Sequence, residues 1–252
     1  MPSRVLMSPF TYKLTCEYDG TSYHGWQKQP HHTTLQETIE TALATITREH
    51  PAVTGASRTD AGVHAKGQVA HFQLVRSMEP RPLLLGMNAL LPQDIAIKSI
   101  DQVDASFHAR YQAKQKTYCY SIYRGATRSA YERHTAWYIR TPLHLTKMRK
   151  AAKSLIGKHD FTSLAATEKE EKNYIVEMKD IRITQRGERL LITLVASRFL
   201  RYMVRNIVGL LVEVGHGRRP VSDIAAVLDA KDRRQAGPTA PPHGLCLMNI
   251  EY

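Results

Sequence analysis

The sequence predicts an α+β protein, because strand and helix patterns alternate in both halves of the chain. The first half runs strand, helix, strand, helix, strand, over residues 12–18, 35–48, 68–74, 82–91 and 95–100. The second half has a similar mixture, with strands at 117–123, 175–184, 190–196 and 245–252 and helices at 145–156, 199–214 and 220–228. Residues 101–116 lack a clear period, and 252 residues suffice for two modest cores. We therefore expect two halves, 1–105 and 106–252.

The first half opens on a half-buried strand and a capped helix. From Tyr12 to Tyr18, apolar or aromatic residues alternate with polar ones, which is the period of a strand with one face in a core. Thr34 and Glu37 then form a T-x-x-E capping box, after a loop. An apolar stripe from Leu35 to Ile46 indicates that the helix continues from there to about residue 48.

The second half carries turn and cap residues at its predicted boundaries. Gly157 closes the helix predicted at 145–156, and Pro220 stands near the first turn of a later helix. Arg186-Gly187 joins two strands as a hairpin. The charged run EKEEK at 168–172 predicts a solvated loop.

The helix predicted at 199–214 combines a buried segment with positive charge. Residues 207–212 are apolar around the whole helix, which indicates burial. On this prediction Arg198, Arg201 and Arg205 share one helical face, at the spacing i, i+3, i+7. A guanidinium so close to a core is costly unless a carboxylate meets it.

Three interpretations of Arg205 stay open at this point. It could pair with Asp60, where a bidentate contact would keep the carboxylate ionised and oriented. It could pair instead with another acid, such as Glu213 or Asp223. Its stem could also lie along apolar surface while its charge reaches water.

The composition indicates a soluble globular protein with a polyanionic partner. There are 35 Lys and Arg against 23 Asp and Glu, a formal charge of +12, which favours nucleic acid, although many basic proteins bind nothing in particular. The longest apolar run is far shorter than the ~20 residues of a membrane helix. Cys16, Cys119 and Cys246 are far apart, which predicts buried thiols rather than disulfides or a zinc site. We therefore expect a cytoplasmic protein.

The stretch from Gly55 to Phe72 combines loop chemistry with a strand. Its first half is rich in turn-forming residues, and the period of two from Gln68 to Leu74 predicts a strand. Asp60 therefore lies at the tip of a loop that a strand holds, which is a common way to present a catalytic group. The plainer interpretation is that Asp60 only closes the turn through backbone amides.

The loop at 19–32 mixes aromatic and basic side chains. Tyr23 and Trp26 could stack on unpaired bases while Lys28, His31 and His32 meet phosphate. In the alternative interpretation Trp26 pins the loop to the body of the protein. The composition of the loop supports both equally.

The string R-T-D-A-G-V-H-A followed by G-Q-V-A-H-F closely resembles the signature of the TruA-type tRNA pseudouridine synthases. Further strings are similar to motifs of that family: YDG, GWQ, KTYCY, MVRNIVG and GLCL. They span the chain from Tyr18 to Leu247. The resemblance implies two α+β halves whose antiparallel sheets join across a basic cleft, which is the pseudouridine synthase fold.

The resemblance also implies a role for each matched residue. Asp60 takes the position of the essential catalytic aspartate, and Arg205 that of the arginine that meets it. Tyr118 matches the active-site tyrosine, whose ring and hydroxyl could hold a flipped uracil. As a core residue on a strand it would need no function. Leu245 and Leu247 would form apolar walls around the base.

RNA contacts are expected from basic and aromatic side chains near these motifs: Trp26, Lys28, Arg58, His64, Arg198 and Arg201. Two positions depart from the family pattern. Ser57 stands where the family usually has glycine, which matters if the backbone there needs a positive φ. Asn173 stands where the family usually has arginine.

The implied reaction detaches uracil from its ribose at N1, turns it within the site and rejoins it through C5. It needs no cofactor and no metal, and Asp60 could act as nucleophile or as base. The implied substrate is uridine at tRNA positions 38 to 40 in the anticodon stem-loop, and a homodimer is typical of the family. A non-catalytic RNA-binding protein and a metal-dependent hydrolase are the alternatives.

Overall fold

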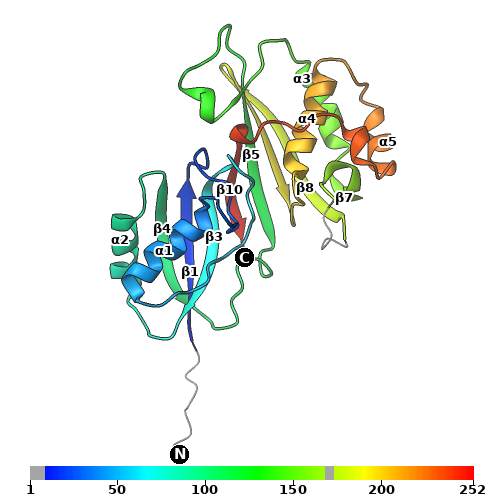
Figure 1. Cartoon of the computed structure of the whole chain (residues 1–252). Helices are drawn as coiled ribbons and strands as arrows, with labels where there is room; N and C mark the ends of the chain where they lie inside the picture. Colours follow the sequence, from blue (N-terminus) through cyan, green and yellow to red (C-terminus); the bar gives the residue numbers. More distant parts are fainter. Residues whose placement is uncertain (1–8, 168–172) are drawn as a thin grey trace, which may run out of the picture. The chain divides into compact units, whose positions relative to one another are not determined.

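A computed structural model describes residues 9–167 and 173–252. The described chain forms two compact units: unit 1 runs to Ala113 and includes Tyr252, and unit 2 is Lys114–Glu251. Both units mix strands with helices, so the predicted α+β class is confirmed (Figure 1). The charged run at 168–172 lies outside the described residues. The halves 1–105 and 106–252, as domains with separate tasks, stay a prediction.

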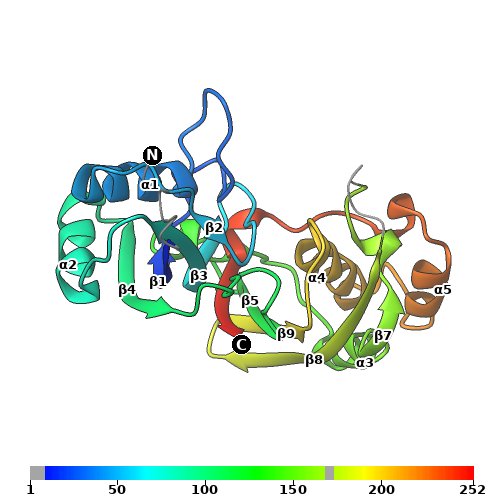
Figure 2. The same cartoon turned by 90° about the horizontal axis from the view of Figure 1, so that it is seen from below.

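Unit 1 contains an antiparallel sheet in the order β4-β1-β3, with β2 paired to β3. Its elements are β1 (Phe10–Tyr18), α1 (Leu35–Thr47), β2 (Thr54–Gly55), β3 (His64–Leu74), α2 (Pro80–Leu90) and β4 (Ile95–Val103). Leu14 of the central strand pairs with Ala70 on one side and Ile100 on the other. Helices α1 and α2 lie on the same side of this sheet (Figure 2).

The core of unit 1 follows from the alternation predicted for its first strand. Tyr12, Leu14, Cys16 and Tyr18 of β1 are all buried, and the polar residues that alternate with them are half-buried: Lys13, Thr15 and Glu17. Helix α1 begins at the predicted cap, where the amide of the third residue, Glu37, donates to Thr34 Oγ1. The half-buried strand and the capped helix are therefore confirmed.

Unit 2 contains an antiparallel strand series in the order β10-β5-β9-β8-β7, with β6 parallel to β5. Its strands and helices are β5 (Gln115–Tyr123), β6 (Trp137–Tyr138), α3 (Leu145–Lys153), β7 (Gly157–Asp160), β8 (Ile175–Arg186), β9 (Arg189–Ala196), α4 (Met203–Gly215), α5 (Asp223–Asp229) and β10 (Leu245–Glu251). Short 3₁₀ turns lie at Glu132–His134, Thr162–Leu164, Arg233–Ala236 and Pro242–Gly244. Helices α3 and α4 pack against one another. The predicted hairpin around Gly187, whose φ is 57°, is confirmed.

Helix α4 begins at Met203, and the prediction that it begins at Phe199 is wrong. Tyr202 has a φ of 61°, a left-handed conformation in which an α-helix does not continue. Arg198 and Arg201 therefore precede the helix, and the predicted helical face shared by three arginines does not exist. The buried character predicted for 207–212 is confirmed.

Strand β3 begins at His64, earlier than the predicted start at Gln68. A register shift separates the pairs that β1 makes with β3 through Cys16 and through Tyr18. Such a bulge interrupts the period of two, so the alternation becomes readable only after it.

Two helices of unit 2 are shorter than predicted. Helix α3 ends at Lys153, and Gly157, with a φ of 112°, begins strand β7 instead of closing the helix directly. Helix α5 begins at Asp223, because Pro220 is followed by a turn. The strands β2, β6 and β7 were not predicted, since such short segments show no period.

The cysteines agree with the prediction only in part. All three lie in the described ranges, and none forms a disulfide. Cys16 is buried as predicted, whereas Cys119 and Cys246 are half-buried. They alternate with the inward-facing Tyr118 and Leu247, which explains their partial exposure. No helix within 9–167 and 173–252 is long and apolar enough to cross a membrane.

Candidate active site

The predicted site residues are divided between the two units. Unit 1 carries Asp60 and the loop with Trp26 and Lys28, while unit 2 carries Tyr118 and Arg205. The pairing of Asp60 with Arg205 joins residues of different units and stays a prediction.

Asp60 is half-buried in the loop between β2 and β3, and backbone hydrogen bonds anchor this loop. The Val63 amide donates to the Asp60 carbonyl oxygen at 3.1 Å, and the Gly62 amide donates to the Tyr23 carbonyl oxygen at 3.3 Å. Gly62 has a φ of 76°, which favours glycine at this turn. The backbone that carries the carboxylate is therefore held in one place, as a catalytic group requires.

The loop at 19–33 packs directly against the Asp60 loop. The Trp26 amide donates to the Thr59 carbonyl oxygen at 3.0 Å. Gly25 has a φ of 89°, and a Cβ there would lie 2.7 Å from the same carbonyl oxygen. Glycine at position 25 therefore lets the two loops approach each other closely.

Trp26 is a core residue in this structure, with 1% of its surface exposed. Gly55 lies against its indole, so closely that a Cβ at Gly55 would be 2.5 Å from Nε1. The Tyr18 ring lies on it too, with centroids 6.1 Å apart. Stacking on a nucleobase needs an accessible ring face. The structure therefore favours the interpretation in which Trp26 pins the loop.

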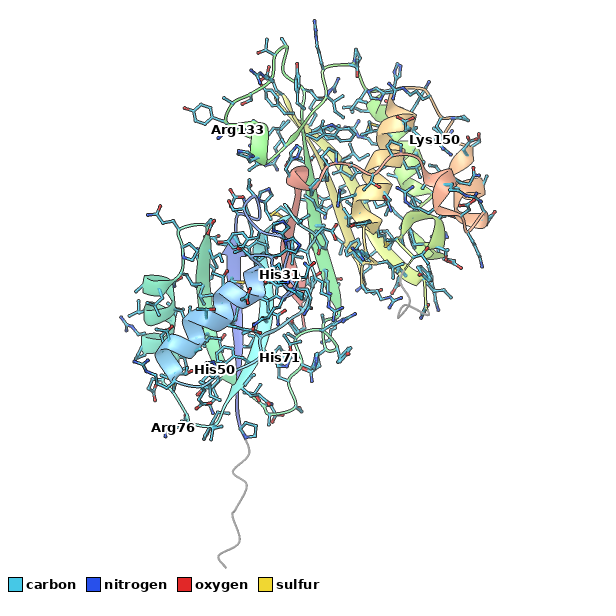
Figure 3. All side chains as sticks on the ribbon, in the orientation of Figure 1. His31, His50, His71, Arg76, Arg133 and Lys150 are labelled. Atoms are coloured by element: carbon cyan, nitrogen blue, oxygen red, sulfur yellow. The ribbon has the colours of Figure 1, made fainter. Side chains whose placement is uncertain are left out.

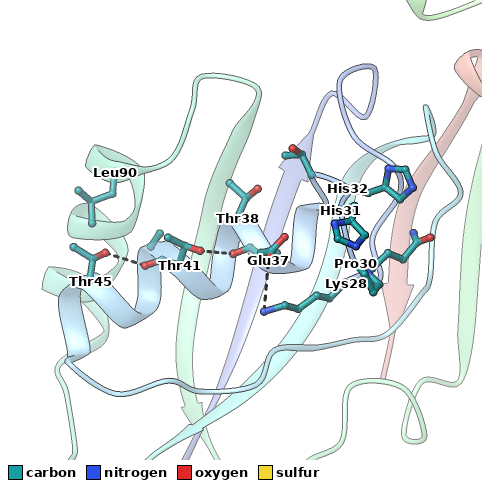
Figure 4. Close-up of a pocket in the computed structure, with 12 residues that line it drawn as sticks. Lys28, Pro30, His31, His32, Glu37, Thr38, Thr41, Thr45 and Leu90 are labelled. Carbon is teal, nitrogen blue, oxygen red and sulfur yellow. Dashed lines mark hydrogen bonds and ion pairs between the residues drawn. The ribbon is translucent and has the colours of Figure 1, made fainter.

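Lys28 lies at a groove of about 780 Å³ along helix α1 (Figure 4). Its Nζ is 3.5 Å from a Glu37 oxygen and 3.7 Å from a Glu40 oxygen. His31 and His32 line the same groove. The two carboxylates reduce the positive potential that would attract a phosphate here. The predicted RNA contact of Lys28 stays a prediction.

The other predicted RNA contacts of unit 1 differ in exposure. Arg58 is exposed beside the Asp60 loop, whereas the His64 ring is buried. Both the Gly20 amide and an Asp19 carboxylate oxygen lie 3.1 Å from His64 Nδ1, so this ring joins β3 to the loop at 19–33. Ser57 is not among the described residues with positive φ, so serine fits its backbone.

Tyr118 and Leu245 lie in neighbouring strands of unit 2. The Tyr118 ring is 5% exposed and meets Phe199 edge to face, with centroids 5.1 Å apart. Tyr118 pairs with Leu247 of β10, and Leu245 pairs with Tyr120. The predicted inward face of β5 is confirmed. The two leucines of the GLCL string therefore flank the same strand face as the tyrosine.

Arg205 lies in the first turn of α4 and is held from two sides. Its Nε donates to the Ala240 carbonyl oxygen at 2.8 Å, and the Ala240 amide donates back to the Arg205 carbonyl oxygen at 3.0 Å. The guanidinium carbon is 5.1 Å from the ring centroid of Tyr202, a cation–π distance. Glu213, one of the alternative partners, accepts instead from Arg218 at 2.9 Å.

The segment at 238–241, which contains Ala240, is fixed against α4 and β5. A Cβ at Gly209 would lie 1.8 Å from the Pro238 carbonyl oxygen, so the helix touches this backbone directly. The Tyr120 hydroxyl donates to the Pro241 carbonyl oxygen at 2.8 Å. Burial raises the pKa of Tyr120, and the nearby charge of Arg205 acts in the opposite direction. The charge of Arg205 is therefore close enough to act on the Tyr120 hydroxyl.

Arg198 and Arg201 belong to the segment before α4. An Arg198 Nη donates to the backbone oxygen of Asn173, and the Arg201 guanidinium lies 5.0 Å from the Tyr202 ring centroid. The Asn173 side chain accepts from the Ile175 amide at 2.9 Å. RNA contacts of the two arginines stay predictions. Within the described ranges, no three His, Cys, Asp or Glu side chains gather closely enough to hold a metal ion.

Comparison with known proteins covers nearly the whole chain. A family model described as tRNA pseudouridine synthase matches residues 15–112 and 151–252. Those ranges contain Asp60, Arg205 and Leu245, while Tyr118 falls between them.

Three proteins named tRNA pseudouridine synthase A show the extent of the similarity. The Geobacter sulfurreducens protein is 43% identical over 242 residues, which cover 96% of this chain and 99% of that protein. The Exiguobacterium protein is 42% identical over 240 residues, covering 95% and 97%. The Myxococcus xanthus protein is 41% identical over 241 residues, covering 95% and 91%. This chain belongs to the tRNA pseudouridine synthase family.

Proposed function

We propose that this protein isomerises uridine to pseudouridine in tRNA, at positions 38 to 40 of the anticodon stem-loop. In this reaction the bond from uracil N1 to ribose C1′ breaks, the base turns, and C5 bonds to C1′. The proton on C5 is lost to water and N1 takes up a proton, so the reaction is an isomerisation in which no oxidant, reductant or second substrate takes part. The observation that carries this proposal is near full-length similarity to tRNA pseudouridine synthases, with Asp60 in a tightly anchored loop.

Asp60 is assigned the catalytic role, as nucleophile or as base. Arg205 is assigned the task of keeping Asp60 ionised and oriented. The bond from its Nε to Ala240 supports this role, because it limits how the guanidinium can turn. Tyr118 is assigned to contact the flipped uracil, with Leu245 as an apolar wall.

Recognition of tRNA is assigned mainly to charge and shape, because paired stems present few readable base edges. Basic side chains lie on both units, among them Arg76 on unit 1 and Lys150 on unit 2 (Figure 3). The exposed Arg58 and Arg201 are the strongest candidates for phosphate contacts near the site. We also propose that the protein is a homodimer and acts in the cytoplasm, where its substrate is made.

Release of tritium from uracil C5 of unmodified tRNA tests the assignment. Asp60→Asn keeps the shape of the side chain and removes its charge, so tritium release should stop while tRNA binding stays within about twofold. Asp101→Asn, an exposed carboxylate of β4, is the matched control and should release tritium at the wild-type rate. Tritium release by Asp60→Asn at the wild-type rate would remove Asp60 from the mechanism. Wild-type protein that binds tRNA but releases no tritium would favour a non-catalytic RNA-binding protein.

A further inference from the structure

We infer that Gln68 is a positioning residue for this reaction, because its side-chain amide fixes the loop that carries Asp60. The inference rests on the proposed function, in which Asp60 acts on the uridine. Gln68 is near the start of β3, and none of its surface is exposed. It does not need to touch RNA to matter, because it holds the backbone of the catalytic loop.

Gln68 occupies a position where the fold otherwise buries apolar side chains. Ala70, Phe72 and Leu74 follow it at every second residue of β3, and all three are buried. Burying an amide without partners is unfavourable, because the group loses its hydrogen bonds to water. An amide at this position is therefore explained only by the groups to which it is bonded.

The side-chain amide of Gln68 makes two hydrogen bonds to the backbone of a single loop residue. Its Oε1 accepts from the Ser57 amide at 3.3 Å, and its Nε2 donates to the Ser57 carbonyl oxygen at 2.7 Å. One side chain thus satisfies both polar backbone groups of Ser57, as a neighbouring strand would. The loop that leads to Asp60 is thereby tied to β3.

The same amide connects to the residue before Asp60 through Tyr18. Gln68 Nε2 lies 3.4 Å from the Tyr18 hydroxyl oxygen, which in turn lies 2.8 Å from Thr59 Oγ1. Tyr18 and Thr59 are both buried, so water does not compete for these hydrogen bonds. The network of Gln68, Tyr18 and Thr59 therefore holds the Asp60 loop at Ser57 and at Thr59.

Positioning of this kind acts on the chemical step. A misplacement of about 1 Å can cost on the order of 100-fold in rate, even when substrate binding is intact. Because Gln68 and Tyr18 are buried, their loss should leave the RNA-binding surface in place. The expected signature is a large fall in kcat with little change in the Kd for tRNA.

Two substitutions of Gln68 separate its hydrogen bonds from its volume. Gln68→Met keeps the approximate shape and removes every hydrogen bond, so kcat for tritium release should fall about 100-fold. Gln68→Glu keeps an acceptor for the Ser57 amide, but its ionised form lacks a donor for the Ser57 carbonyl oxygen, so kcat should fall as rising pH ionises the carboxyl. The Kd for tRNA should stay within about twofold for both variants.

Asn88, which is exposed, provides a control with the same pattern of hydrogen bonds in the same unit. Its Oδ1 accepts from the Ile97 amide at 2.8 Å, and its Nδ2 donates to the Ile97 carbonyl oxygen at 2.9 Å. As in Gln68, one side-chain amide makes two hydrogen bonds to the backbone of a single residue, but here that residue belongs to β4. Asn88→Ala should keep kcat within about twofold of wild type, even if its melting temperature falls.

Tyr18→Phe keeps the inference testable if a Gln68 variant does not fold, since it removes only one oxygen atom. It should lower kcat at least about tenfold, with tRNA binding retained. Wild-type kcat in Gln68→Met and Tyr18→Phe would overturn the inference, and so would an equal loss in Asn88→Ala. If wild type releases tritium and Asp60→Asn does not, these results overturn the positioning role alone. Wild type without tritium release would overturn the proposed function and this inference with it.

Discussion

At the residue scale, the proposed mechanism depends on the charge state of Asp60. A guanidinium beside a carboxylate favours the ionised form and lowers its pKa by about 1–3 units. Arg205 is held by Ala240 and by the Tyr202 ring, which suits a group that must point in one direction. The proposed pairing therefore has a consequence for the pH dependence of the enzyme.

Removing the guanidinium should move the acid limb of the pH–rate profile. In Arg205→Met the pKa of Asp60 should rise, so activity should be lost at a higher pH than in wild type as the solution is acidified. The profile of kcat/KM for tritium release measures this shift. Arg218→Met, which removes a guanidinium from the end of α4, is the control. An unchanged acid limb in Arg205→Met would contradict the pairing.

His71 gives a second prediction about pH, this time for stability. Burial, with a smaller effect from the neighbouring His108, lowers the pKa of His71 below its ordinary value of 6.5. Its Nδ1 accepts from the Ala109 amide at 3.2 Å, and Lys13 stands opposite it on β1. The unfolded chain therefore binds the proton first as the pH falls, so stability is lost on acidification below about 6.5.

Denaturant unfolding at pH 7.5 and at pH 5 tests this prediction. Wild type should lose more stability between the two conditions than His71→Gln, because glutamine does not titrate. Burial also lowers the pKa of His216. The loss of stability that His216 causes on acidification is the same in both proteins, so it cancels in the comparison. An equal loss in the two proteins would show that His71 does not contribute.

Asp60 and Arg205 were assigned to the site because they stand in strings that resemble one family, and their roles stay predictions. Their surroundings were harder to predict from the sequence. Trp26 was ambiguous, because loop composition does not reveal that Gly55 covers the indole. Gln68 was quoted in a motif without a role, although a polar residue on an inward strand position is a readable signal.

At the element scale, α4 links the buried core of unit 2 to Arg205. Its start is set by Tyr202, whose left-handed backbone brings its ring beneath the guanidinium groups of Arg201 and Arg205. Its middle touches the segment around Pro238 without any side chain between them. The position of Arg205 therefore depends on how closely the helix packs.

A pair of glycine substitutions tests this packing. Gly209→Ala should cost about 1–3 kcal/mol of unfolding free energy or more, because its Cβ would lie 1.8 Å from the Pro238 carbonyl oxygen. Gly86→Ala in α2 meets only the tip of Ile46 at 3.2 Å, so it should be neutral or gain up to about 1 kcal/mol. Urea unfolding of both variants measures the contrast. Equal stability of the two would contradict the close contact.

Elements with a full period were predictable, and interrupted ones were not. Strand β1 and helix α1 agree with the sequence because alternation and a capping box mark them directly. The start of β3 was hidden by a bulge, and the start of α4 by a single left-handed residue. Both are local backbone choices that tertiary contacts decide, so no side-chain period records them.

At the scale of the whole molecule, a formal charge of +12 should make tRNA binding strongly dependent on salt. Each phosphate contact adds about one unit to the slope of log Kd against log salt concentration. Arg58→Gln should lower this slope by about one if Arg58 meets a phosphate, and Arg58→Lys should keep it. Filter binding over a salt series measures the slopes, and an identical slope in all three proteins would remove Arg58 from the interface.

Fold class and family were the properties of the whole molecule that the sequence predicted most fully. Strands and helices alternate in both units, and several different motifs of one family are spread along the chain from Tyr18 to Leu247. The homodimer was predicted from the family alone and stays a prediction, because no run of residues in the sequence marks an interface.

Mapping pseudouridine in one tRNA transcript tests the central claim most directly. A transcript with uridines at positions 38, 39 and 40 is incubated with the purified protein in the presence of a metal chelator, and modified positions are read chemically. The account predicts pseudouridine within positions 38 to 40 with wild type and none with Asp60→Asn. A transcript that is bound but unmodified, or modified only outside the anticodon stem-loop, would contradict it.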